Sequence, residues 1–115
     1  MTALVRLENA AIAFVALATY WHVDAGWWLF LLLVLVPDLA MLGYLFGSRF
    51  GAICYNALHS FLGVGLLLVS GYLLGWDPAA PLALIWIFHI GFDRALGYGL
   101  KHQSGFKDTH LGRIG

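Results

Sequence analysis

The chain has 115 residues, of which 62% are hydrophobic and 10% are charged, and its formal net charge is zero. A soluble domain of this size buries only about two thirds of its surface and is usually about 25% charged, so the composition argues against an ordinary soluble domain. Nucleic acid is not expected as a partner either, because its binding needs a concentrated basic surface. We therefore expect a single all-α integral membrane domain whose main partner is the lipid bilayer.

Four apolar runs are each long enough to cross a bilayer, which takes about 20 helical residues. They cover approximately residues 4–21, 27–46, 52–74 and 80–100. Because the runs are continuous rather than alternating, they predict helices and not strands. The connections HVDAG, GSRFG and GWDPAAP are short and contain turn residues, which predicts an up-down four-helix bundle. Residues 1–100 form this predicted membrane domain, and residues 101–115 form a polar tail.

Charged residues are distributed unevenly between the two ends of the predicted bundle. The end that holds both termini and the second connection carries or lies near all six basic residues, which are Arg6, Arg49, Arg94, Lys101, Lys107 and Arg113. The opposite end carries Asp24 and Asp77 and has no Lys or Arg. The positive-inside rule then places both termini and the tail in the cytoplasm.

Each predicted helix also carries an ionisable side chain, although a charge near the bilayer centre costs about 2.5–3.5 kcal/mol on insertion scales. At about 1.5 Å per residue, these side chains fall within one layer about 10 Å thick. They are Glu8, Asp38, His59, His89 and Asp93. His89 and Asp93 are four residues apart and therefore share a helix face. We expect one interior site near the cytoplasmic side, to which all four helices contribute.

Two imidazoles with two or three carboxylates suit a divalent metal such as zinc, manganese or iron. In this hypothesis Asp38, His59, His89 and Asp93 are the metal ligands, and Glu8 is either a further ligand or a catalytic general base. The metal would activate water for the hydrolysis of an unknown small-molecule or lipid substrate.

Three other interpretations use the same residues. Glu8, Asp38 or Asp93 could exchange protons in a small proton-coupled transporter or channel. The polar layer could be a structural scaffold that only specifies how the helices pack. His59 and His89 could ligate a b-type haem, although their levels differ by about one helical turn.

The stretches VPDLAMLGYLFGSRFGAICYNALHSFLG, HIGFDRALGYGLK and SGFKDTHLGRIG resemble the bacterial family catalogued as domain of unknown function 4260. This resemblance covers most of the chain. It implies a small multi-pass membrane protein and supplies no activity. We expect this protein in the bacterial inner membrane.

The chain has PD, then HS on the next helix, and then H four residues before D. On these residues it has a more distant similarity to membrane-bound metal-dependent hydrolases related to the inner-membrane protein YdjM. Carried over, this similarity implies that Asp38, His59, His89 and Asp93 are metal ligands. The chain departs from the pattern at Glu8, where those relatives usually carry a histidine. It also has YN at residues 55–56, where they tend to have HR.

Two further features leave alternatives open. The tail motif DTH contains Asp108 and His110, which could fold over the cytoplasmic mouth of the site or lie near anionic headgroups. The segment GYLFGSRFG spaces its glycines four apart, as do Gly71 and Gly75. Such spacing allows close helix contact, either inside one bundle or in a homodimer.

Overall fold

The computed structural model of the protein describes residues 2–97, 108–109 and 112–113. Its helices are α1 (Thr2–Val23), α2 (Trp27–Leu33), the 3-10 helix η1 (Val36–Phe46), α3 (Ser48–Leu58), α4 (Phe61–Leu74) and α5 (Ala79–Ala95). Two short strands, β1 (Asp108–Thr109) and β2 (Gly112–Arg113), pair antiparallel within the predicted tail. The predicted all-α class is therefore confirmed, with one two-residue strand pairing that the sequence did not predict.

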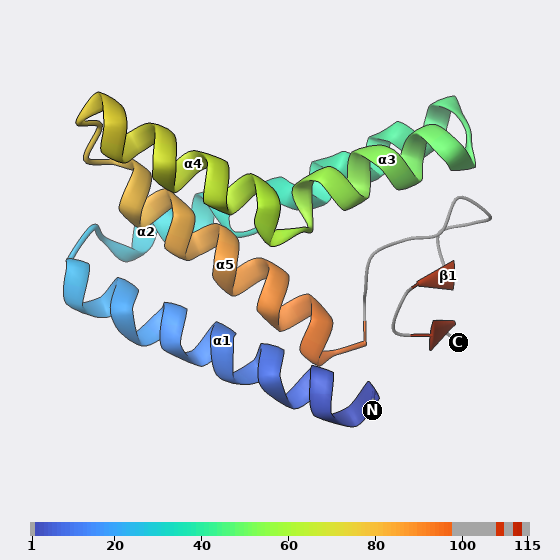
Figure 1. The fold of residues 1–115 in the computed structure, drawn as a ribbon, viewed down its shortest axis with the longest axis horizontal. Helices are drawn as coiled ribbons and strands as arrows, with labels where there is room; N and C mark the ends of the chain where they lie inside the picture. The colour runs from blue at the N-terminus through green and yellow to red at the C-terminus, as the bar shows by residue number, and fades with distance from the viewer. Residues whose placement is uncertain (1, 98–107, 110–111, 114–115) are drawn as a thin grey trace.

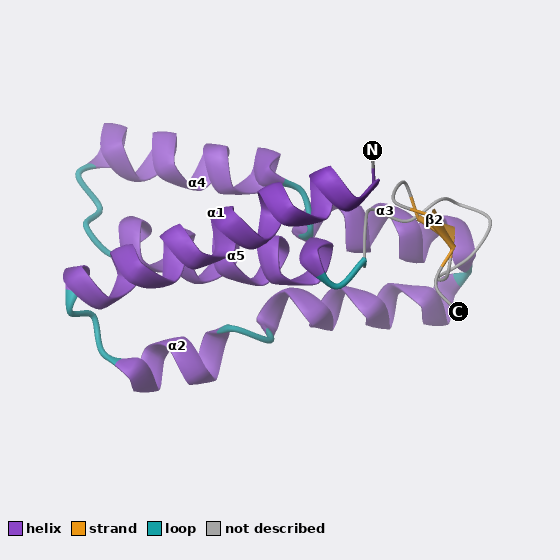
Figure 2. Cartoon of the chain, turned by 90° about the horizontal axis from the view of Figure 1, so that it is seen from below, coloured by secondary structure: helices purple, strands orange, loops and turns teal. Residues whose placement is uncertain are grey.

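Helix α5 lies at the centre of the arrangement (Figure 1). It packs against both α1 and α4, while α3 packs against η1. The N-terminus and the η1–α3 turn lie at one end of the molecule, and the α1–α2 and α4–α5 connections lie at the other. Figure 2, turned by 90°, shows the same two ends. The connections thus alternate between the two ends, while the up-down four-helix bundle stays a prediction.

The second apolar run is not a continuous α-helix. Helix α2 ends at Leu33, four residues before Pro37. Proline lacks an amide hydrogen and its ring clashes with the carbonyl four residues earlier, which explains this end. The chain continues as the 3-10 helix η1, with Asp38 in its first turn. Trp27–Phe46 as a whole is still long and apolar enough to cross a membrane, as is Ala3–Val23 in α1.

The third apolar run is broken, so the predicted continuous helix over residues 52–74 is wrong. Helices α3 and α4 are bent by 47° at His59 and Ser60. The Ser60 hydroxyl accepts a hydrogen bond from the Leu62 amide and caps α4. The Trp86 indole donates to the Leu58 carbonyl at 2.6 Å. Backbone groups freed by the break thus find partners, as an apolar environment requires.

The fourth run is shorter as a helix than predicted, because α5 has 17 residues and ends at Ala95. Gly97 follows with φ +94, the left-handed conformation that commonly ends a helix and that glycine adopts without strain. Residues 98–100 of the predicted span lie outside the described residues. Among the described residues, two helical stretches are long and apolar enough to cross a membrane, or three if the bent α3–α4 pair is one span, and the predicted four spans are not confirmed.

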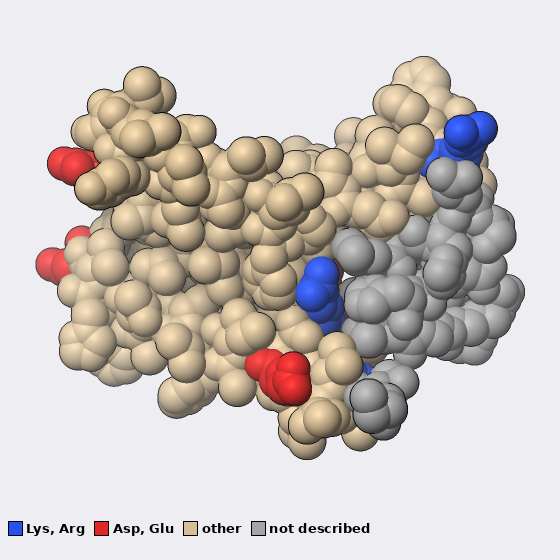
Figure 3. All heavy atoms as spheres, viewed as in Figure 1, with Lys and Arg blue, Asp and Glu red and all other residues tan. Residues whose placement is uncertain are grey.

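The described surface is strongly apolar. Buried clusters are small, and one of them consists of Tyr20, Phe30 and Ile85. Trp28 and Leu45 are each 80% exposed. On the face drawn in Figure 3 most atoms belong to uncharged residues, and acidic atoms lie at the end with the α1–α2 and α4–α5 connections and again near the lower edge. Soluble monomers rarely expose large apolar patches, so this surface indicates a membrane protein.

The regularly spaced glycines make contacts inside the chain. A Cβ atom at Gly51 would collide with the Tyr44 ring, and one at Gly71 would collide with Ala79. These contacts hold η1 against α3 and close the α4–α5 connection. Packing within one bundle thus accounts for these two glycines, and the homodimer stays a prediction.

Candidate metal centre

Four ionisable side chains from three parts of the fold meet at one point. Asp38 comes from η1, His59 from the α3–α4 break, and His89 and Asp93 from successive turns of α5. One nitrogen or carboxylate oxygen from each of the four lies within 4.8 Å of the other three. The structure thus brings together four of the five ionisable residues that the sequence analysis placed in one layer, and Glu8 is the exception.

The imidazole nitrogens lie at the centre of this cluster. His59 Nε2 and His89 Nε2 are 3.0 Å apart. Asp38 Oδ1 is 3.2 Å from the first and 3.1 Å from the second. Asp93 Oδ2 is 3.3 Å and 3.2 Å from the same two atoms. Ligand atoms around a tetrahedral metal with bonds near 2.0 Å are about 3.3 Å apart, so these spacings match a small tetrahedral site.

The outer edges of both imidazoles are held by backbone carbonyls. His59 Nδ1 lies 2.9 Å from the Tyr55 carbonyl oxygen. Because a carbonyl only accepts, Nδ1 carries the hydrogen and the Nε2 lone pair of a neutral His59 faces the cluster. His89 likewise forms a backbone hydrogen bond with Val34. Metal-binding histidines are typically oriented in this way, with the second ring nitrogen donating to a carbonyl or carboxylate.

Tyr55 supports two of the four residues, although it was not among the predicted site residues. Its ring stacks on the His59 imidazole, with centroids 3.8 Å apart and planes at 4°. Its hydroxyl forms a hydrogen bond with the Asp93 side chain. Tyr55 precedes His59 by four residues on α3, which places both on one face. That spacing was the signal from which its role could have been predicted.

The cluster is buried on its histidine side and more open on its carboxylate side. The side chains of His59 and His89 are 2% and 4% exposed, whereas those of Asp38 and Asp93 are 31% and 17% exposed. Water or a small polar group would therefore reach the site past Asp38.

The prediction that Glu8 lies in this cluster is wrong. Glu8 is exposed on α1 and is not one of the four clustered residues. Its neighbour Asn9 is 5% exposed and takes the inward position instead. Successive helical residues are separated by about 100° around the axis, so Glu8 points away when Asn9 points inward.

Arg94 follows Asp93 but serves a different group. Its Nη2 atom donates to the His59 carbonyl at 3.4 Å, and its guanidinium lies over the Phe61 ring, 4.8 Å from the centroid. A cation is favourable beside carbonyls at a helix C-terminus, which here is the end of α3. Arg94 thus helps to hold the helix break that positions His59.

The haem alternative and the tail motif DTH remain to be compared with the structure. A haem iron between axial histidines would need the two ligand nitrogens about 4 Å apart, more than the 3.0 Å between the Nε2 atoms of His59 and His89, so the spacing does not fit a b-type haem. Asp108 begins β1, while His110 lies outside the described residues.

Comparison with known proteins gives the family. Residues 2–114 match the model of the family described as Domain of unknown function (DUF4260). The chain belongs to this family. No curated protein and no solved structure matches the chain. Membership of DUF4260 is thus confirmed, and the similarity to YdjM-related hydrolases is not shown. The DUF4260 match supplies no activity, so function has to be argued from the site.

Proposed function

We propose that this DUF4260 protein binds a divalent metal ion through Asp38, His59, His89 and Asp93 and uses it for hydrolytic chemistry. The observation that carries the proposal is the convergence of the four ligand atoms, five of whose mutual distances are 3.0–3.3 Å. The backbone contacts of both imidazoles leave the inner ring nitrogens to face the carboxylates.

Electrostatics favours a cation at this point over a purely structural network. Two carboxylate oxygens and two imidazole lone pairs repel one another when nothing positive lies between them. A hydrogen-bonded scaffold would alternate donors with acceptors, whereas this cluster presents four acceptors when both histidines are neutral. A shared proton satisfies some of these contacts, and a metal ion satisfies all four.

The donor set also limits the chemistry. Two imidazoles and two carboxylates suit zinc, manganese or iron better than calcium or magnesium, which prefer oxygen ligands. Such an ion would act as a Lewis acid and, if zinc, would lower the pKa of a bound water to about 7. The open side at Asp38 is where water and substrate would enter. Glu8 is exposed and lies outside the group of possible ligands among the described residues, so the proposal gives it no part in this chemistry.

For the membrane arrangement we infer four crossings in a bacterial inner membrane, with α3 and α4 forming one bent crossing and α5 a short one. Residues 1–100 would be the membrane domain, followed by a cytoplasmic tail at 101–115. The long axis of the described chain measures 39 Å, which suits a hydrocarbon core of about 30 Å with its interfaces. Asp24 and Asp77 lie in the connections at one end, opposite the end with the N-terminus and the turn that Arg49 follows.

Cysteine labelling in intact cells tests the crossings. In a Cys54→Ser background, a cysteine introduced at Asp24 or Asp77 should react with a membrane-impermeant maleimide. A cysteine at Arg49 should react only after the cells are opened. Labelling of all three from outside would overturn the assigned orientation.

Metal analysis of the purified protein tests the centre itself. We expect close to one divalent ion per chain, and loss of the ion in His59→Ala and Asp93→Asn. His22→Ala is the matched control, because His22 is exposed near the end of α1 and should leave metal content unchanged. A folded wild-type protein without metal would overturn the proposal. In that case, pH-dependent flux in liposomes that is lost in Asp38→Asn would favour the transporter instead.

A further inference from the structure

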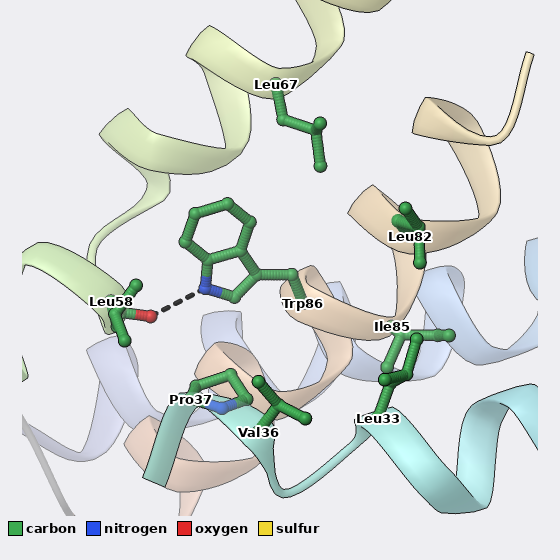
Figure 4. A pocket seen from close by; sticks show the side chains of 8 residues that line it. All are labelled: Leu33, Val36, Pro37, Leu58, Leu67, Leu82, Ile85 and Trp86. Atoms are coloured by element: carbon green, nitrogen blue, oxygen red, sulfur yellow. Dashed lines mark hydrogen bonds between the residues drawn. The ribbon is translucent and has the colours of Figure 1, made fainter. Parts of the chain in front are cut away.

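An apolar pocket of about 400 Å³ lies beside the metal centre. Eight residues from α2, η1, α3, α4 and α5 line it, and all except Trp86 are Leu, Ile, Val or Pro (Figure 4). The indole of Trp86 lies among these side chains, between Leu58 and Leu67 in the view of Figure 4. The volume is within the range of about 300–1,000 Å³ that is usual for ligand sites.

The pocket and the metal centre share their walls. Pro37 directly precedes Asp38, and Leu58 directly precedes His59. On α5, Leu82 and Trp86 precede His89 by seven and three residues, so they continue the same face away from the centre. A ligand in the pocket would therefore lie end-on to the four clustered residues, on the side toward the α4–α5 connection.

The lining determines what can bind. The side-chain donor in the lining is the Trp86 indole, and its hydrogen is already donated to the Leu58 carbonyl at 2.6 Å. A polar ligand group would lose its hydrogen bonds to water there without replacement. Only a hydrocarbon chain fits such surroundings. The wall is open at Val36, which is 42% exposed, so the chain could enter sideways from the bilayer.

We propose that this pocket holds one acyl chain of a membrane phospholipid, whose polar part then lies at the open, Asp38 side of the metal centre. This inference adds a substrate class to the proposed metal-dependent function. The placement of the polar part rests on that function. The substrate class is accordingly a lipid that enters from the membrane, and not a water-soluble molecule. Surrounding bilayer lipid supplies the chain at high local concentration.

Lipid retention provides the test. Protein purified in detergent is loaded with a diacyl phosphatidylglycerol, washed by exhaustive detergent exchange, and extracted for quantification of bound phospholipid by mass spectrometry. We expect close to one phospholipid per chain. Leu67→Trp, which fills the pocket, should lower retention at least tenfold. Leu66→Trp is the matched control, because Leu66 is 66% exposed on the same helix and should retain wild-type lipid.

Metal content measured on the same samples separates this inference from the proposed function. Leu67→Trp should keep the metal, and the bound metal also shows that this variant is folded. If Leu67→Trp does not fold, Leu82→Trp is used in its place. Asp93→Asn should lose the metal and keep the phospholipid. Absence of retained lipid in a metal-loaded wild type, or equal loss in Leu66→Trp and Leu67→Trp, overturns the pocket assignment alone. Retained lipid in a wild type without metal leaves the acyl site standing and overturns the proposed function and the placement of the polar part.

Discussion

Replacing Asp38 by asparagine keeps the shape of the side chain and removes its charge. Asp38 Oδ1 contacts the Nε2 atoms of both histidines, at 3.2 Å and 3.1 Å, so it is a corner of the proposed metal site. Its side chain is also the most exposed of the four, at 31%. Asp38→Asn should therefore weaken metal binding with little direct effect on packing.

The expected loss of metal affinity follows from the number of ligands. Structural zinc sites contribute about 10–16 kcal/mol, or about 2.5–4 kcal/mol for each of four ligands. Loss of one ligand then weakens the dissociation constant about 100-fold or more. At a metal concentration 100 times the wild-type constant, the wild type gains about 2.7 kcal/mol of folding free energy and the variant at most about 0.4 kcal/mol. The difference corresponds to about 10 °C in the midpoint of thermal unfolding.

Thermal unfolding in detergent, followed by tryptophan fluorescence with and without the ion that copurifies with the protein, measures this difference. The wild type should be stabilised by the ion, and Asp38→Asn should show almost no metal-dependent shift. Asp77→Asn is the control, because Asp77 is an exposed aspartate in the α4–α5 connection. An undiminished metal-dependent shift in Asp38→Asn would refute the assignment of Asp38 as a ligand.

Two other substitutions test how the site and the fold are supported. Tyr55→Phe keeps the stacking on the His59 imidazole and removes the hydroxyl that bonds Asp93. Metal titration should therefore show a metal affinity about 10-fold weaker than in the wild type. Unchanged affinity would count against a role of the Tyr55 hydroxyl in holding Asp93. Gly91→Ala would place a Cβ 2.7 Å from the Asn9 carbonyl oxygen and should destabilise the α1–α5 contact by about 1–3 kcal/mol in denaturant unfolding. Gly65→Ala meets nothing within 4 Å and should be neutral or stabilising by up to about 1 kcal/mol; equal destabilisation by both alanines would show that crowding at Gly91 is not the cause.

The residues of the candidate site could be predicted because depth along a helix follows from counting residues. Counting from the same end of each run placed Asp38, His59 and Asp93 at similar levels, and the structure brings their side chains together. His89 was predicted one turn deeper, yet it joins the cluster. Helical side chains lean toward the N-terminus of their helix, so the Asp93 carboxylate reaches back to the imidazole four residues earlier.

Rotation about the helix axis could not be predicted in the same way. Glu8 has the right depth and the wrong direction, because the contact of α1 with α5 turns Asn9 inward. The spacing of Tyr55 from His59 could have predicted their contact, but the bond of its hydroxyl to Asp93 could not be predicted, because it depends on how α5 lies against α3.

The amino-acid sequence by itself determined that the chain is helical and apolar enough for a membrane, where its turns fall, and which ionisable residues occur at one level. These properties depend on composition and on residue spacing along a single helix. The tertiary structure decided the break at His59 and Ser60, the 3-10 path after Pro37, and which side chains face each other across helices. Those outcomes depend on partners distant in the chain, such as the Trp86 indole at the Leu58 carbonyl, and spacing within one helix does not specify them.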